Sequence, residues 1–197
     1  MAGTIIADFI RTDANRLSLQ VGNTTFATIN AMGLLSNTGT TIIAANGVIS
    51  GAGTIAKTAL PSGSILQVVS ANVTATQIST TSTSFVTTNF SASITPTSAT
   101  SKVYVVFMGE NLNTSGAQYG MFTLYRGSTN LGGSQGMVQN NNASAWLPFT
   151  ISCVDSPATT SSTTYAIYQR TSNASNTVYV GWGADAIHTF VLMEIAA

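Results

Sequence analysis

The sequence predicts an all-β protein, in which an extended N-terminal arm or stalk of short strands precedes a jelly-roll-like β-sandwich. Val, Ile and Thr stand in short runs that Gly, Asn and Ser separate, which is the pattern of strands and turns. Apolar residues at helical spacing are missing. Only 6% of the 197 residues are charged, whereas 44% are hydrophobic and the formal net charge is +0. So few charges indicate a surface that other protein covers.

Residues 1–59 are expected to form the arm or stalk. Turn signals recur at short intervals, for example at Gly22-Asn23 and Asn46-Gly47, so the strands between them must be short. The best strand is 16–21, where apolar and polar residues alternate. A segment of this kind buries little apolar surface by itself, and we expect it to wind around neighbouring copies. A hinge is predicted at Leu60-Pro61-Ser62-Gly63.

Residues 60–197 are expected to form the head domain, because the predicted strands become longer there. They cover residues 65–69, 84–94, 102–108, 121–125, 146–154, 164–170, 177–182 and 190–195. Eight strands with turn-rich connections predict two packed sheets. The polar loops 111–117, 131–142 and 171–176 are expected at the exposed ends of the sandwich.

Two of these strands are apolar on both faces. Side chains alternate along a strand, so a sandwich buries only one face of each strand and a second apolar face requires a second interface. A closed homotrimer is the simplest arrangement that covers it. The residues predicted at the trimer interface are Tyr104, Val106, Met108, Val191, Met193 and Ile195.

The head domain resembles a domain of virion proteins from marine and freshwater bacteriophages, which are described as tail fibres or virion structural proteins. The segments that carry the resemblance are Leu60-Pro61-Ser62-Gly63-Ser64-Ile65-Leu66-Gln67-Val68-Val69, Ile94-Thr95-Pro96 to Ser101-Lys102-Val103, Leu124-Tyr125-Arg126-Gly127-Ser128, Asp155-Ser156-Pro157-Ala158-Thr159-Thr160, and Val191-Leu192-Met193-Glu194-Ile195-Ala196-Ala197. The resemblance implies a trimeric head on a virion surface, made in the host bacterial cytoplasm. Tail fibres normally have a longer shaft, so a capsid cement or decoration protein is the alternative.

Two sets of residues are candidates for contacts with partners. Asp8, Arg11, Asp13 and Arg16 form the only locally charged segment, which predicts ion pairs with another virion protein of the capsid shell or the tail. The alternative for these four residues is a solvated turn. Tyr119, Trp146 and Trp182 lie near predicted loops and are candidates for contact with a host glycan or receptor, because aromatic rings stack on sugars and anchor interfaces. Trp182 is equally consistent with a core position.

Catalysis is not expected, although two motifs suggest it. Gly132-Gly133-Ser134-Gln135-Gly136 matches the nucleophile motif of α/β-hydrolases, and Asp155 and His188 follow in the hydrolase order. No helical pattern succeeds Ser134, whereas a nucleophile elbow requires one. The segment 51–58 matches a phosphate-binding loop except at Ala56, and it too lacks a following helix.

No cofactor or metal is expected. His188 is the only histidine and Cys153 the only cysteine, so an intramolecular disulfide is excluded and Cys153 is predicted to be an inert core residue. Asp185 and His188 are the one pair that suggests a shared cation site on a trimer axis. A chain of zero net charge is not expected to bind nucleic acid. Membrane insertion is not expected either, because no apolar run is long enough.

Overall fold

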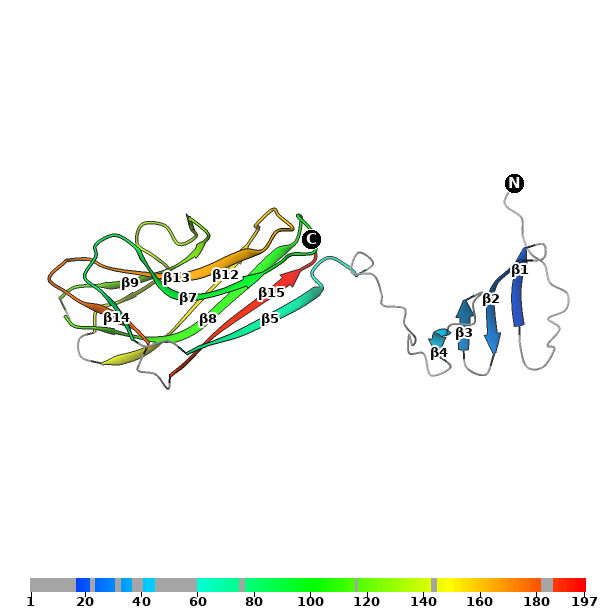
Figure 1. Ribbon diagram of the computed structural model, residues 1–197, viewed down its shortest axis with the longest axis horizontal. Coiled ribbons are helices and arrows are strands. Elements are labelled where there is room, and N and C mark those ends of the chain that lie inside the picture. Colours follow the sequence, from blue (N-terminus) through cyan, green and yellow to red (C-terminus); the bar gives the residue numbers. More distant parts are fainter. Residues whose placement is uncertain are drawn as a thin grey trace. The chain divides into compact units, whose positions relative to one another are not determined.

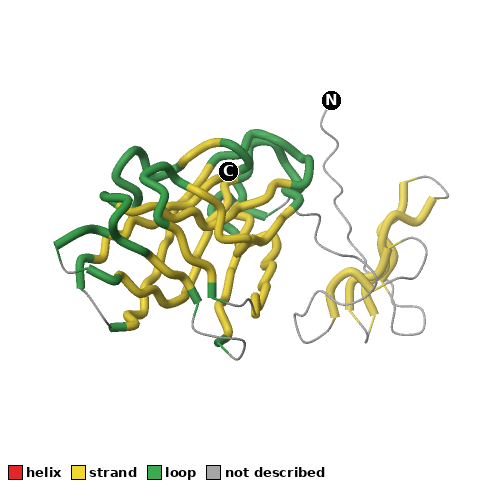
Figure 2. The backbone as a smooth tube through the Cα atoms, turned by 60° about the vertical axis from the view of Figure 1, so that its left-hand side comes forward, coloured by secondary structure: helices red, strands yellow, loops and turns green. Residues whose placement is uncertain are grey.

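The computed structural model of the protein describes residues 17–21, 24–30, 33–36, 41–44, 60–74, 77–115, 117–142, 145–181 and 186–197. The chain divides into two compact units, Met1–Ala59 and Leu60–Ala197. All regular structure in the described residues is β-strand (Figure 2). The structure therefore confirms the predicted all-β class.

The described residues of the N-terminal unit form four short strands. They are β1 (Leu17–Val21), β2 (Thr24–Asn30), β3 (Gly33–Ser36) and β4 (Thr41–Ala44). Each strand pairs antiparallel with the next along the chain, in the order β1-β2-β3-β4. Close spacing of the turn residues explains why these strands are short. The charged residues Asp8, Arg11, Asp13 and Arg16 lie outside the described residues.

The described residues of the head form eleven strands in two antiparallel sheets (Figure 1). Their bounds are β5 (Ile65–Thr74), β6 (Ile78–Thr80), β7 (Val86–Ile94), β8 (Lys102–Asn113), β9 (Gly120–Arg126), β10 (Thr129–Asn130), β11 (Val138–Asn140), β12 (Trp146–Asp155), β13 (Thr163–Thr171), β14 (Val178–Val180) and β15 (Ile187–Ile195). The large sheet has the order β5-β15-β8-β14-β6, with β12 paired to β8. The small sheet has the order β10-β9-β13-β7, with β11 paired to β9.

The hydrophobic core lies between the two sheets, to which each long strand contributes alternate side chains. Phe107 of β8 is at its centre, with ring centroids 4.8 Å from Phe190, 5.5 Å from Phe149 and 6.0 Å from Phe90. All four rings are buried. The two-sheet β-sandwich expected from the sequence is therefore present.

The chain enters and leaves the head at one end, which we call the proximal end. There the Gly63 N–H donates to the Ala196 carbonyl at 2.9 Å, and the Ala196 N–H donates to the Ser64 carbonyl at 2.9 Å. Gly63 has φ +87°, a conformation that L side chains rarely adopt. β8 runs from this end to the opposite, distal end, where its last residue pairs with Val178.

Several strand ends differ from the predicted ones. β5 extends to Thr74 rather than Val69, because Ser70 and Asn72 occupy exposed positions and the alternation continues beyond the apolar run. β8 extends to Asn113 and β14 ends at Val180. The predicted loops 111–117 and 131–142 therefore each contain part of a strand.

Candidate functional site

The six residues predicted at a trimer interface lie on one surface, the outward side of the large sheet, which we call the apolar face. Along β8 and β15 they alternate with side chains of the core. The six are Tyr104, Val106, Met108, Val191, Met193 and Ile195. The structure thus brings them together, while their role as an interface stays a prediction.

Three rows of side chains cross the apolar face from β5 to β12. The first row consists of Val68, Met193, Tyr104 and Val154. The second consists of Ser70, Val191, Val106 and Ser152, and the third of Asn72, Thr189, Met108 and Thr150. Neighbours in such rows are close enough to form one continuous surface.

Exposed apolar side chains are concentrated on this face. Among the described residues, six large apolar side chains are exposed, and five belong to the large sheet. They are Ile65 (56%), Val68 (56%), Met108 (47%), Val154 (58%) and Ile187 (63%). Seven of the twelve side chains in the three rows are apolar, so this face is a candidate interaction surface.

The outward side of the small sheet is polar in comparison. Thr87, Asn89, Ser91 and Ser93 of β7 are all exposed there. The Ser93 hydroxyl is 2.7 Å from the Thr164 hydroxyl of β13, within hydrogen-bond distance. The part of this sheet formed by β7 is therefore suited to contact water, in contrast to the apolar face of the large sheet.

One aromatic cluster on the small sheet was missed from the sequence. The rings of Tyr125 and Tyr168 stack with centroids 3.9 Å apart, and Phe85 meets Tyr125 edge-on at 6.3 Å. The Arg170 guanidinium lies 5.2 Å from the Phe85 ring centroid. Each ring contributes to cross-strand packing. Only the strand pairing, which joins β9 to β13, brings these residues together.

The distal loops are anchored by a buried network of asparagine side chains. Asn113 Nδ2 donates to the carbonyls of Ser115 and Gln118 at 2.7 Å and to that of Asn140 at 3.2 Å. Asn176 Nδ2 donates to Asn113 Oδ1 at 2.6 Å. Asn113 and Asn176 are fully buried, so water does not compete for these bonds. Three loops are thereby held by one amide group.

Replacing Asn113 with Ala is expected to loosen these loops. The carbonyls that Asn113 satisfies would lose a buried donor, which costs about 1–3 kcal/mol of unfolding free energy. Hydrogen exchange should accelerate at residues 114–118 and 172–177. The control is Asn142→Ala, because Asn142 is exposed. Unchanged exchange in both segments of Asn113→Ala would contradict the anchoring role.

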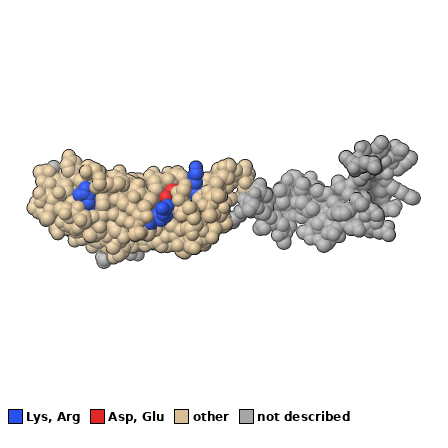
Figure 3. All heavy atoms as spheres, turned by 90° about the horizontal axis from the view of Figure 1, so that it is seen from above, with Lys and Arg blue, Asp and Glu red and all other residues tan. Residues whose placement is uncertain are grey.

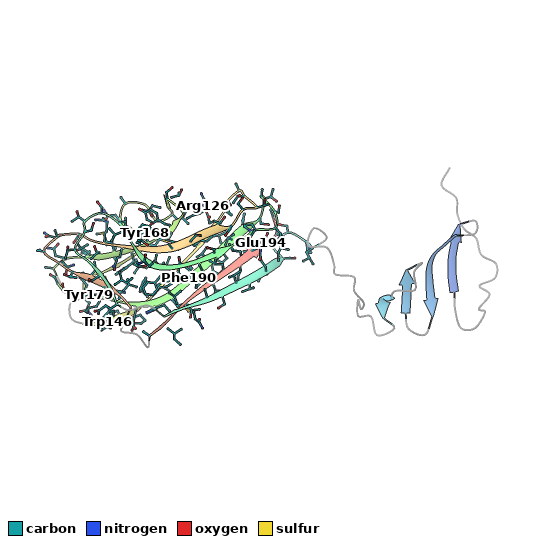
Figure 4. The ribbon with its side chains drawn as sticks, in the orientation of Figure 1. Arg126, Trp146, Tyr168, Tyr179, Phe190 and Glu194 are labelled. Carbon is teal, nitrogen blue, oxygen red and sulfur yellow. The ribbon has the colours of Figure 1, made fainter. Side chains whose placement is uncertain are left out.

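The three aromatic candidates for ligand contact do not form one site. Tyr119 is 42% exposed and precedes β9 of the small sheet, where its N–H donates to the Ser172 hydroxyl at 2.8 Å. Trp146 begins β12 of the large sheet, and its ring lies 6.4 Å from Tyr179 at the distal end (Figure 4). Trp182 lies outside the described residues. The aromatic partner of Trp146 is thus Tyr179, which the sequence did not single out.

Few side chains on the face of the head seen in Figure 3 are charged. One ion pair, between Arg126 and Asp155, links the two sheets. Arg126 of β9 donates from Nη1 to both carboxylate oxygens of Asp155 on β12, at 2.7 and 2.8 Å. The Tyr165 hydroxyl of β13 donates to Asp155 at 2.7 Å. Burial, together with this bond, raises the pKa of Tyr165 far above its usual value. These contacts fasten β12 to the small sheet.

Glu194 has no cationic partner among the described residues, yet it is fully buried at the proximal end. Its carboxylate accepts the Thr97 N–H at 2.7 Å, the Thr97 hydroxyl at 2.8 Å and Gln67 Nε2 at 2.6 Å. Burial by itself raises the pKa of this carboxyl, but the hydrogen bonds outweigh burial and hold the pKa below its usual value. Glu194 thus ties β15 to β5 and to the loop after β7.

The hydrolase residues do not form a triad. His188 is 2% exposed, its ring centroid is 4.9 Å from that of Phe90, and its Nε2 has no hydrogen-bond partner among the described residues. The Asp155 carboxylate is bound by Arg126 and Tyr165. A triad requires the acid to orient the histidine. The phosphate-loop-like segment 51–58 lies outside the described residues.

Stability is expected to fall in acid, beginning near neutral pH. Burial lowers the pKa of His188 from 6.5, although the Glu110 carboxylate opposes this. The unfolded chain therefore binds a proton below pH 6.5 that the folded chain does not, so stability is full above pH 6.5 and decreases as the pH falls. The lowered pKa of Glu194 adds a further loss below pH 4.5.

Urea unfolding between pH 8 and pH 5 checks this dependence. When unfolding binds one proton, the free energy of unfolding falls by at most about 1.4 kcal/mol for each pH unit that the pH is lowered. His188→Leu should remove the slope between pH 6.5 and pH 5. A variant with the same slope as the parent in that range would assign the dependence to another group.

The described residues contain no group of three His, Cys, Asp or Glu side chains that could hold a metal ion. Asp185 lies outside them, so the paired cation site with His188 stays untested. Cys153 is half-buried, and burial followed by the nearby Asp155 charge raises the pKa of its thiol. A thiol with a raised pKa is a poor nucleophile at neutral pH. No helix that is long and apolar enough to cross a membrane occurs in this part of the chain.

Comparisons with known proteins add no functional assignment to this geometry. No protein-family model matches the chain, and no curated protein matches it significantly.

Proposed function

We propose that the protein is a nonenzymatic structural protein of a bacteriophage virion, displayed on the particle surface as a homotrimeric fibre or adhesin. The N-terminal unit attaches to a capsid or tail protein, with Asp8, Arg11, Asp13 and Arg16 as the attachment residues. The head contacts the host surface. No cofactor takes part, and neither nucleic acid nor a membrane is a partner.

The observation that supports this proposal is the apolar face. Five of the six exposed large apolar side chains in the described residues belong to the large sheet. Of the side chains on its three central rows none is charged. A protein with so few charges elsewhere does not keep such a face in water, because copies would associate through it.

A three-fold axis along the strands covers this face in a closed assembly. The three apolar faces turn toward the axis, and the polar faces of the three small sheets turn toward solvent. All distal loops then lie at one end of the trimer. The asparagine network holds these loops in a defined shape, as a surface that recognises a host glycan or receptor requires. Tyr119 is the exposed aromatic side chain there.

A capsid cement protein is the second candidate. In this alternative the same trimer locks neighbouring shell subunits, and the N-terminal unit lies between them. Many copies are then present on each particle.

Two measurements test the proposal. Light scattering of the purified chain should give the mass of a trimer, and a monomer would contradict it. Quantitative mass spectrometry of purified virions then gives the copy number relative to the major shell protein. A small multiple of three supports the fibre, and a number comparable to the shell protein supports the cement protein. Absence from the virion would overturn both.

A further inference from the structure

We infer that β5 of one head pairs with β12 of the neighbouring head, so that three large sheets join edge to edge around the trimer axis. This inference rests on the proposed trimer and adds the contact that closes it. The joined strands are Ile65–Thr74 of one copy and Trp146–Asp155 of the next.

β5 is an unprotected edge of the large sheet. It has ten residues, with neither Pro nor a charged residue, and pairs only with β15. Proteins normally protect long edge strands by charges, Pro, bulges or short length. β6, β10 and β11 have only two or three residues, and β7 carries a register shift and Asn89 at φ 62°. The one irregularity of β5 is a register shift between Ile65 and Gln67, before the regular part of the strand.

β5 and β12 also match in direction and in length. β5, β15, β8 and β12 alternate in direction, so β5 and β12 run antiparallel to each other. A three-fold axis along the strands preserves this relation between neighbouring copies. Both strands have ten residues. Pro148 of β12 has no N–H to donate, so the pairing is expected along the part of β12 that follows it, from Phe149 to Val154, which carries the ends of the three rows.

The rows of the apolar face would continue across the joined edges. Each row ends in chemically matched residues on β5 and β12. The matched pairs are Val68 with Val154, Ser70 with Ser152, and Asn72 with Thr150. Val68 and Val154 are 56% and 58% exposed in the single head, so pairing of β5 with β12 would bury both side chains.

Area supports a stable contact. Four strands about 4.8 Å apart and ten residues long, at about 3.3 Å per residue, present a face of roughly 600 Å². Two such faces together reach about 1,200 Å², where specific, stable interfaces begin. Backbone hydrogen bonds between β5 and β12 add to this. No side chain on the three rows is charged, and the nearest charged side chains on this side of β8 are Lys102 and Glu110, one position beyond the rows at either end.

Cysteine cross-linking tests the pairing. In a full-length Cys153→Ala background, the double variant Ser70→Cys/Ser152→Cys is treated with an oxidant or a short bismaleimide. Most of the chain should become covalent trimer on a denaturing gel, with dimer as the intermediate. The control is Ser70→Cys/Ser93→Cys, because Ser93 is exposed on the small sheet and should not react with Ser70→Cys.

The single variants distinguish other arrangements. Cross-linking of Ser70→Cys by itself would show that β5 pairs with β5 and would overturn the inference. A trimer by light scattering whose double variant does not cross-link would also overturn it, and the proposed function would stand. A monomer by light scattering would overturn both.

Discussion

Val106→Lys is expected to convert the trimer into a monomer. Val106 lies on the middle row of the apolar face and on the central strand β8. Three ammonium groups would be brought together near the axis, and removing each from water without a partner costs several kcal/mol. In the isolated head the same side chain extends into solvent, so the sandwich should still fold. Light scattering gives the mass, and circular dichroism checks the fold.

Ser91→Lys is the matched control for this change. Ser91 is exposed on β7 of the small sheet, so the added charge should leave the mass of a trimer unchanged. If Val106→Lys remains a trimer with native stability, the apolar face is not the subunit interface. If Ser91→Lys dissociates instead, the interface is on the small sheet.

Phe107→Ala is expected to be the most destabilising single change in the head. The Phe107 ring is fully buried and packs against Phe90, Phe149 and Phe190. Truncation of a buried phenylalanine removes apolar contacts and leaves a cavity, at a cost of about 3–5 kcal/mol. A domain of this size has a free energy of unfolding of only about 5–15 kcal/mol, so this change would remove a large part of it. Urea unfolding at neutral pH measures the loss.

Tyr119→Ala serves as the control, because it also truncates an aromatic ring but at a position that is 42% exposed. Its effect on unfolding should stay within about 0.5 kcal/mol, as for most surface substitutions. Similar losses in both variants would mean that Phe107 does not lie at the centre of the core.

The asymmetry of the sandwich links its stability to its proposed role. Both sheets supply the core, but only the large sheet carries a second apolar surface. At the distal end, the uncharged side chains of Asn113 and Asn176 connect the loops by hydrogen bonds. Such bonds depend little on salt. A particle exposed to varied surroundings would benefit from that independence.

Among the candidate interface residues, those on β8 and β15 could be predicted from the sequence, whereas those that depend on strand pairing could not. Tyr104, Val106 and Val191 were predictable, because the direction of a side chain alternates with each residue along a strand. Val68 and Val154 were not, although they end the same row, because strand order determines which residues share a row. Asn113 was placed in a loop, since a polar residue at a strand end has no local signal of burial.

The sequence by itself determined that the protein is all-β, that two of its strands are apolar on both faces, and that its surface is almost uncharged. These properties follow from composition and from a period of two, which are local. Only the tertiary structure decided which strands are neighbours, that Asp155 binds Arg126, that His188 lies among phenylalanines, and that the exposed apolar residues share one face. These properties arise from contacts between residues far apart in the chain, whose formation depends on the packing of the whole sandwich.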